Sequence, residues 1–235
     1  MSKLNKLKYY VHIKSDLKRR LKIIDYCNIN TLFDIGANTG DYSKKMRDLG
    51  YRKRIISFEP LNDAFEILKE SAAKDSNWMV NNYALGNENT KSVINISGNS
   101  CSSSILDMLP KHIESDPDSG YVGKQEINVK KLDSIFNSFV TKTDRVMVKI
   151  DTQGYEKNVI DGAESSLRRV SIIQLEMSIV PLYENELLFT EMIKYLESKG
   201  FKLYSLENGH YNRDTGQLLQ VDGIFVNESL VSQKK

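Results

Sequence analysis

The sequence predicts an α/β fold built on a doubly wound, mostly parallel sheet. Short apolar runs alternate with segments of helical spacing from residue 31 onward, which is the pattern of a parallel sheet with crossover helices. The first apolar run enters a turn that contains two glycines, residues 34–40. The last two runs, 201–206 and 217–226, have no helix between them, so we expect them to pair antiparallel.

Composition restricts the class of protein. The 235 residues fit a single domain, 40% of them are hydrophobic, and the net charge of +2 does not call for a nucleic acid partner. Cys27 and Cys101 are too far apart in sequence for a zinc or redox motif, which predicts free thiols. With no apolar run of membrane-spanning length and no signal-peptide pattern, we expect a cytoplasmic protein, and a homo-oligomer stays open.

Residues 1–30 are predicted to form a basic helical extension ahead of a single domain, 31–235. Apolar residues recur at helical spacing, and lysines and arginines far outnumber the one early acid, Asp16. The favoured interpretation is a solvated helix that packs its apolar face on the domain. The alternatives are weak contact with a membrane surface and contact with an acidic glycan.

The turn Asp34-Ile35-Gly36-Ala37-Asn38-Thr39-Gly40 lies between a strand at 31–33 and a helix at 41–49. Its D-x-G-x-x-x-G spacing matches neither the dinucleotide fingerprint nor a phosphate loop. An acidic side chain here would repel a pyrophosphate and suit a ligand with a cationic amino group. The turn therefore favours a nucleoside that carries an amino acid, such as S-adenosylmethionine.

A second strand, 54–58, ends at Glu59 and is followed by a helix at 61–74. A carboxylate at the end of this strand can accept both hydroxyls of a ribose. A third strand covers 78–83 and a further strand 91–96. Because residues 97–124 are rich in Ser, Gly and Pro, we expect a long loop there that acts as a lid.

The second half of the chain repeats the strand and helix alternation. Strands are expected at 125–130, 145–150 and 170–177, and helices at 132–139, 155–161 and 186–199. Strand ends then bring Asp34 to Gly40, Glu59, residues 82–84, Asp151 to Gly154 and Glu176 to one edge of the sheet, where such folds bind ligands.

Several motifs occur in order along the chain: FDIGANTG, FEP, NYALG, a serine run near Ser103, KIDTQGYEKNVIDGA, QLEMS with PLYE after it, and LLQVDGIF. Because it contains these motifs in this order, the chain resembles the FkbM family of S-adenosylmethionine-dependent methyltransferases. The resemblance implies the class I, Rossmann-like methyltransferase fold, with a seven-stranded sheet whose last strand is antiparallel.

The resemblance also implies roles for residues at the motif positions. The methionine part of the cofactor would be surrounded by Asp34, Gly36, Ala37, Asn38 and Gly40. The ribose hydroxyls would bind Glu59, the adenine would lie beside Asn82, Tyr83 and Ala84, and the sulfonium would lie near Asp151.

Removal of the acceptor proton needs a base. Asp151 is the first candidate and Glu176 the second, and His210 is a third because its imidazole titrates near neutral pH. Ser102, Ser103, Gln153 and Tyr183 are assigned to substrate binding. A divalent cation held by Asp151, Glu176 and Asp222 is an alternative that the spacing does not favour.

These observations predict an O-methyltransferase that acts on a hydroxyl of a sugar, glycan or secondary metabolite. A binding or scaffold domain without catalysis is the second interpretation. A nucleotide-linked oxidoreductase is the third, and the glycine spacing disfavours it.

Overall fold

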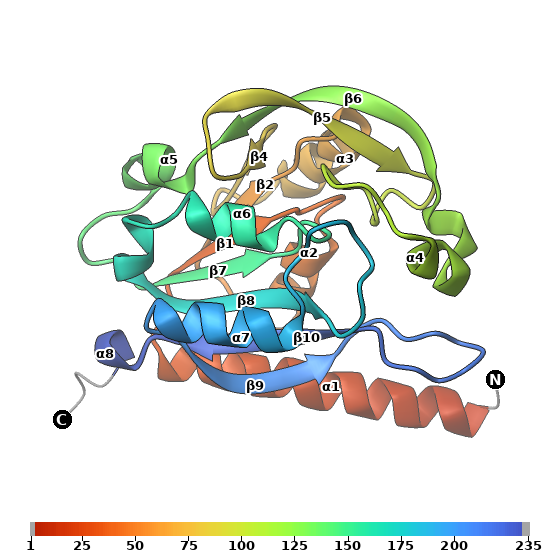
Figure 1. The fold of residues 1–235 in the computed structure, drawn as a ribbon. Helices are drawn as coiled ribbons and strands as arrows, with labels where there is room; N and C mark the ends of the chain where they lie inside the picture. The colour runs from red at the N-terminus through yellow and green to blue at the C-terminus, as the bar shows by residue number, and fades with distance from the viewer. Residues whose placement is uncertain (1–2, 232–235) are drawn as a thin grey trace.

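A seven-stranded sheet forms the centre of the computed structural model, which describes residues 3–231, with side chains from residue 15 onward (Figure 1). The strand order is β3-β2-β1-β7-β8-β10-β9. Its strands are β1 (Thr31–Ile35), β2 (Arg54–Phe58), β3 (Trp78–Asn81), β7 (Val146–Ile150), β8 (Val170–Ser178), β9 (Lys202–Asn208) and β10 (Gln220–Val226).

The last strand, β10, runs against its neighbours. It pairs antiparallel with both β8 and β9, whereas β1, β2, β3, β7 and β8 pair in parallel. This is the predicted sheet, with the predicted antiparallel last strand.

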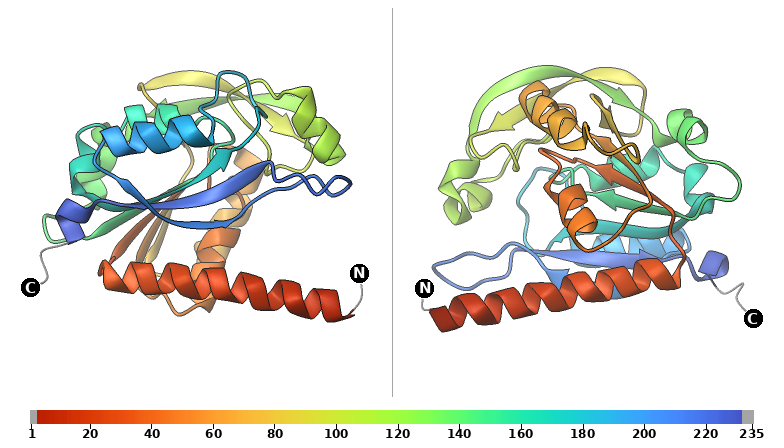
Figure 2. Two further views of the ribbon diagram at one scale, coloured as in Figure 1. Left: turned by 60° about the horizontal axis from the view of Figure 1, so that its bottom comes forward. Right: turned by 180° about the vertical axis from the view of Figure 1, so that it is seen from behind.

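Helices cover both faces of the sheet (Figure 2). One face is covered by α1 (Lys3–Tyr26), α2 (Asp41–Asp48) and α3 (Asn62–Ala72), and the other by α5 (Leu132–Phe139), α6 (Glu156–Asp161) and α7 (Phe189–Ser198). A short helix, α8 (Glu228–Val231), follows β10. Because strand residues alternate between faces, Leu32 packs toward α1–α3 and Phe33 toward α5–α7.

The N-terminal segment is one helix that lies along β9 and β10 (Figures 1 and 2). Ile23, Ile24, Cys27 and Ile29 are buried in the same apolar cluster as Leu32. The second half of α1 therefore packs on the sheet, as the favoured interpretation expected. The apolar positions predicted at residues 4, 7, 10 and 11, like the basic residues there, lie outside the side chains that the structure describes.

A second sheet, of three strands in the order β4-β6-β5, arches over β2 and α3 at one side of the large sheet (Figure 1). It consists of β4 (Ala84–Leu85), β5 (Thr90–Ser97) and β6 (Tyr121–Lys130). The prediction of a loop over 97–124 was wrong in its second half, because this stretch contains α4 (Pro110–Ser115), a 3₁₀ turn (Pro117–Ser119) and the first residues of β6.

No helix within residues 3–231 is long and apolar enough to cross a membrane. Cys27 and Cys101 are both free, as predicted.

Candidate functional site

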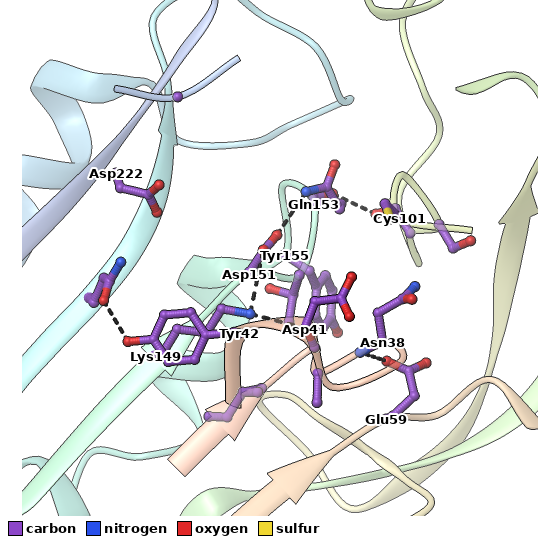
Figure 3. A pocket seen from close by; sticks show the side chains of 18 of the residues that line it. Asn38, Asp41, Tyr42, Glu59, Cys101, Lys149, Asp151, Gln153, Tyr155 and Asp222 are labelled. Carbon is purple, nitrogen blue, oxygen red and sulfur yellow. Dashed lines mark hydrogen bonds and ion pairs between the residues drawn. The ribbon is translucent and has the colours of Figure 1, made fainter. Parts of the chain in front are cut away.

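A cavity of about 880 Å³ opens at the carboxyl ends of β1, β2 and β7 and continues to α1 and the β9–β10 connection (Figure 3). The half of the cavity that lies beneath the small sheet is lined by apolar side chains, among them Ile35, Leu61, Ala84, Leu85 and Ile105. Charged and amide side chains line the middle and the far end. The structure thus brings one apolar and one polar compartment together in a single space.

Gly36 lies where β1 comes closest to β7. Its φ is +71°, and a Cβ here would lie 1.9 Å from the carbonyl oxygen of Asp151. The glycine is therefore required by the approach of two strand ends. Gly40, with φ +87°, packs instead against Leu68 and Trp78, away from the cavity wall.

Glu59 lies at the end of β2 and is 5% exposed. Its carboxylate accepts hydrogen bonds from the Asn38 N–H at 2.7 Å and the Leu61 N–H at 2.9 Å, so two turns hold it in place. Burial raises the pKa of Glu59 to about 7. Each oxygen keeps a second lone pair, and the residue lines the cavity, so it can accept hydrogen bonds from a ligand.

Lys149, on β7, was not among the predicted site residues. Its ammonium donates to the Gly36 carbonyl at 3.1 Å and lies 3.2 Å from an Asp34 oxygen and 3.4 Å from an Asp151 oxygen. Burial alone would lower the pKa of Lys149, but the carboxylates of Asp151 and Asp34 outweigh burial and raise it. A lysine inside the apolar strand Val-Met-Val-Lys-Ile was the available signal, because an unpaired charge there would be costly.

Asp34 lies behind the cavity wall. It is fully buried, its second oxygen accepts a hydrogen bond from Ser43 at 2.7 Å, and it does not line the cavity. In this position it acts on the site through Lys149.

Gln153 connects two of the predicted acidic residues. Its side-chain amide donates to Asp151 at 2.8 Å and to Glu176 at 3.0 Å, and the Gln220 amide also donates to Glu176, at 2.7 Å. Burial and the carboxylates of Asp151 and Asp222 hold the pKa of Glu176 well above its usual range. Asp151 and Gln153 line the cavity, whereas Glu176 lies behind them.

The predicted adenine residues separate into two groups. Ala84 lines the cavity, as do Ala37 and Asn38, which were predicted for the methionine part of the cofactor. The Asn82 amide donates to the carbonyls of Glu59 and Pro60, and the Tyr83 ring packs on Phe58. Asn82 and Tyr83 therefore support the end of β2 from outside the cavity.

The predicted substrate residues are also divided. Ser103 lines the cavity, but its hydroxyl donates to the Ser100 carbonyl, and Ser102 is buried within the same loop. Tyr183 is 1% exposed, and its hydroxyl donates to the Gln153 side chain at 2.7 Å. Tyr183 thus holds Gln153 from behind.

His210 lies in the β9–β10 connection and faces α4. Its Nε2 is 3.1 Å from the Ser115 hydroxyl, its ring stacks on His112, and it does not line the cavity. The structure does not bring His210 together with Asp151.

The far end of the cavity contains residues that the sequence interpretation placed elsewhere or left out. Arg20, predicted as part of a solvated basic face, is buried and forms a two-point ion pair with Glu207. The neighbouring Arg19 donates to Ser205 and to the Leu206 carbonyl. Both arginines have partners within the fold, but only Arg20 is removed from the predicted basic surface, because the Arg19 side chain stays 45% exposed.

Asp222, on β10, lies opposite Glu176 on β8 and Glu207 on β9, and it lines the cavity. The pKa of Asp222 is raised to about 6, mainly by burial, with the carboxylates of Asp151 and Glu207 adding to the increase and Arg20 opposing it. Among the side chains that the structure describes, no group of three or more His, Cys, Asp or Glu is arranged to hold a metal ion.

The sheet order and this edge site define the class, which is the class I S-adenosylmethionine-dependent methyltransferases. The METTL16 methyltransferase domain has this fold, with a TM-score of 0.51 and 8% identity over 90% of this chain and 67% of that chain. A similar structure is the Methanococcus jannaschii fibrillarin pre-rRNA processing protein, with a TM-score of 0.49 and 11% identity over 84% of this chain and 66% of that chain. Another is Aeropyrum pernix fibrillarin in complex with S-adenosyl-L-methionine, with a TM-score of 0.47 and 10% identity over 84% of this chain and 66% of that chain.

The Methyltransferase FkbM domain model matches residues 34–203. The chain therefore belongs to the FkbM methyltransferase family, which confirms the resemblance read from its motifs. No curated protein matches the chain in sequence.

Proposed function

We propose that this methyltransferase transfers a methyl group from S-adenosylmethionine to a hydroxyl of a sugar, glycan or secondary metabolite. The observation that carries the proposal is the continuous cavity in which an apolar compartment beside Glu59 opens onto a polar compartment beside Asp151. The first suits a nucleoside, and the second suits a hydroxylated acceptor.

The residues of the first compartment fit the cofactor. Glu59 would accept the ribose hydroxyls, Leu61 and Ala84 would cover the adenine, and Ala37 and Asn38 would lie along the methionine part. When bound, the cofactor supplies a methyl group on a sulfonium, whose carbon is open to attack by an oxygen nucleophile.

Asp151 would act on the acceptor. The Lys149 ammonium and the Gln153 amide hold its carboxylate at the junction of the two compartments. There it would orient the acceptor hydroxyl and take the hydroxyl proton as the new oxygen–methyl bond forms and the electron pair of the broken bond stays on sulfur.

Calorimetry with S-adenosylhomocysteine and turnover on a panel of sugars and glycans test this function. We expect nanomolar to micromolar binding and transfer to an acceptor oxygen, located by fragmentation in mass spectrometry. Asp151→Asn should bind the cofactor but lose about 100-fold in turnover, while Asp118→Asn, an exposed residue outside the cavity, should match the wild type. Cofactor binding with no turnover on any acceptor would favour the scaffold interpretation.

A further inference from the structure

The far half of the cavity lies beyond Asp151, in the compartment proposed above for the acceptor. It is formed by α1, by the β9–β10 connection and by Asp222, and its wall includes Leu17, Arg20, Glu207, Tyr211, Leu218 and Asp222. Leu17, Tyr211 and Leu218 give it apolar and aromatic flanks, while the acids give it charge. In Figure 3, Asp222 reaches into this space from β10.

Asp222 differs from the other carboxylates of the cavity in having no partner. Five of the six wall carboxylates accept a hydrogen bond or form an ion pair, and Asp222 has neither with any residue that the structure describes. The five partnered acids are Asp16 with Arg19, Asp41 with Lys44, Glu59 with the Asn38 N–H, Asp151 with Lys149, and Glu207 with Arg20.

The cations of the wall do not neutralise Asp222. Arg20 is bound to Glu207, Lys149 is shared by Asp34 and Asp151, and Lys45 is exposed on α2. The far half therefore carries excess negative charge in a partly desolvated space, where a ligand cation would be stabilised and a ligand anion repelled.

We propose that the far half binds an acceptor that carries a protonated amine near its hydroxyl, such as an amino sugar or amino alcohol, with Asp222 as the ion-pair partner of the ammonium. This inference rests on the proposed function, because it names the class of acceptor for the same site. It differs from the acidic glycan that the basic helix suggested, since Arg20, the arginine of this wall, is already bound to Glu207. A bound metal ion is a poorer fit, because the described acids do not converge on one point.

Binding of paired probes tests the proposal. Protein saturated with S-adenosylhomocysteine is titrated at pH 7 with amino sugars, such as glucosamine and galactosamine, and with their N-acetylated forms, which keep the ring but lose the charge. We expect the amino form to bind about tenfold or more tightly, the range of a charge-assisted hydrogen bond. Asp222→Asn should reduce this preference to about twofold or less, whereas Asp214→Asn, an exposed acid of the same connection, should leave it unchanged.

Equal binding of the charged and acetylated forms, retention of the preference in Asp222→Asn, or no binding of any probe would overturn the proposal. Turnover on the same probes separates it from the proposed function. Methylation of neutral sugars alone would keep the O-methyltransferase and overturn the ammonium site. Ammonium-dependent binding with transfer to the nitrogen would keep the site and overturn O-methylation.

Discussion

The pKa of Glu59 predicts that cofactor binding depends on pH. The carboxylate is 5% exposed, and burial raises its pKa to about 7. If only the ionised carboxylate accepts the two ribose hydroxyls, the apparent Kd is the intrinsic Kd multiplied by 1 + 10^(pKa − pH). That factor is about 1.1 at pH 8 and about 11 at pH 6, so affinity should fall about tenfold, or about 1.4 kcal/mol, over two pH units.

Calorimetry with S-adenosylhomocysteine at pH 6, 7 and 8 measures this fall, and buffers of different ionisation enthalpy measure the proton released at low pH. Glu59→Gln should bind about 10- to 100-fold more weakly at pH 8, because a charged acceptor is lost. It should also lose the pH dependence. Glu66→Gln, an exposed acid on α3, serves as the control. A Kd that does not change between pH 6 and 8 in the wild type would refute the reasoning.

The same carboxylate affects stability with the opposite sign. Its folded pKa lies above the unfolded value, so its contribution to stability is present below about pH 4.3 and is lost as pH rises through about 7. A ligand that binds the ionised form compensates for this loss. The increase in Tm on adding S-adenosylhomocysteine should therefore be larger at pH 8 than at pH 6.

Two further predictions concern the junction of β1 and β7. Lys149→Met should reduce the free energy of unfolding, measured in urea, by about 3–5 kcal/mol, because Asp34 is left buried without its cation. A second change, Asp34→Asn, should restore part of the loss. An unchanged urea midpoint in Lys149→Met would contradict this. Gly36→Ala should reduce the free energy of unfolding by about 2 kcal/mol or more, because its Cβ would meet the Asp151 carbonyl. Gly50 has φ +96° and no atom within 4 Å of the position of a Cβ, so Gly50→Ala should lose only the backbone strain of about 1–2 kcal/mol. Equal losses in the two glycine variants would show that the close approach is unimportant.

The sheet could be predicted because its strands are continuous apolar runs that end at turns. The structure of residues 97–124 could not be predicted, because this stretch is polar and shows neither helical nor strand periodicity. Pro110 and Pro117 are typical of loops, yet each lies in the first turn of a helix or 3₁₀ turn, where its missing N–H costs nothing. Likewise α7 begins at Phe189 and not at Glu186, because the Glu186 carboxylate accepts hydrogen bonds from the N–H groups of Leu182 and Tyr183 and holds the preceding loop.

Candidate residues at strand ends could be placed at the correct edge, but sequence could not say which of them face the cavity. Glu59 and Asp151 face it, whereas Glu176 and Tyr183 lie one layer behind and hold Gln153. Strand alternation alone does not separate these layers. Their separation depends on the loops 97–109 and 178–188, and the sequence of these loops has no periodicity from which their conformation could be predicted.

Lys149, which the sequence interpretation missed, and Asp222, which it considered only as a metal ligand, share a signal that could have been used. Lys149 and Asp222 are each the one charged residue of a mostly buried strand, and a lone charge there is unfavourable unless another charge lies near it. The sheet order supplies those charges: Lys149 pairs in register with Asp34, and Asp222 pairs in register with Glu176 and Glu207. The pairing of Lys149 with Asp34 joins opposite charges, which neutralise each other. The second pairing places three carboxyl groups side by side, with Arg20 bound to Glu207, so Asp222 is left in the far half of the cavity without a cation partner among the residues that the structure describes.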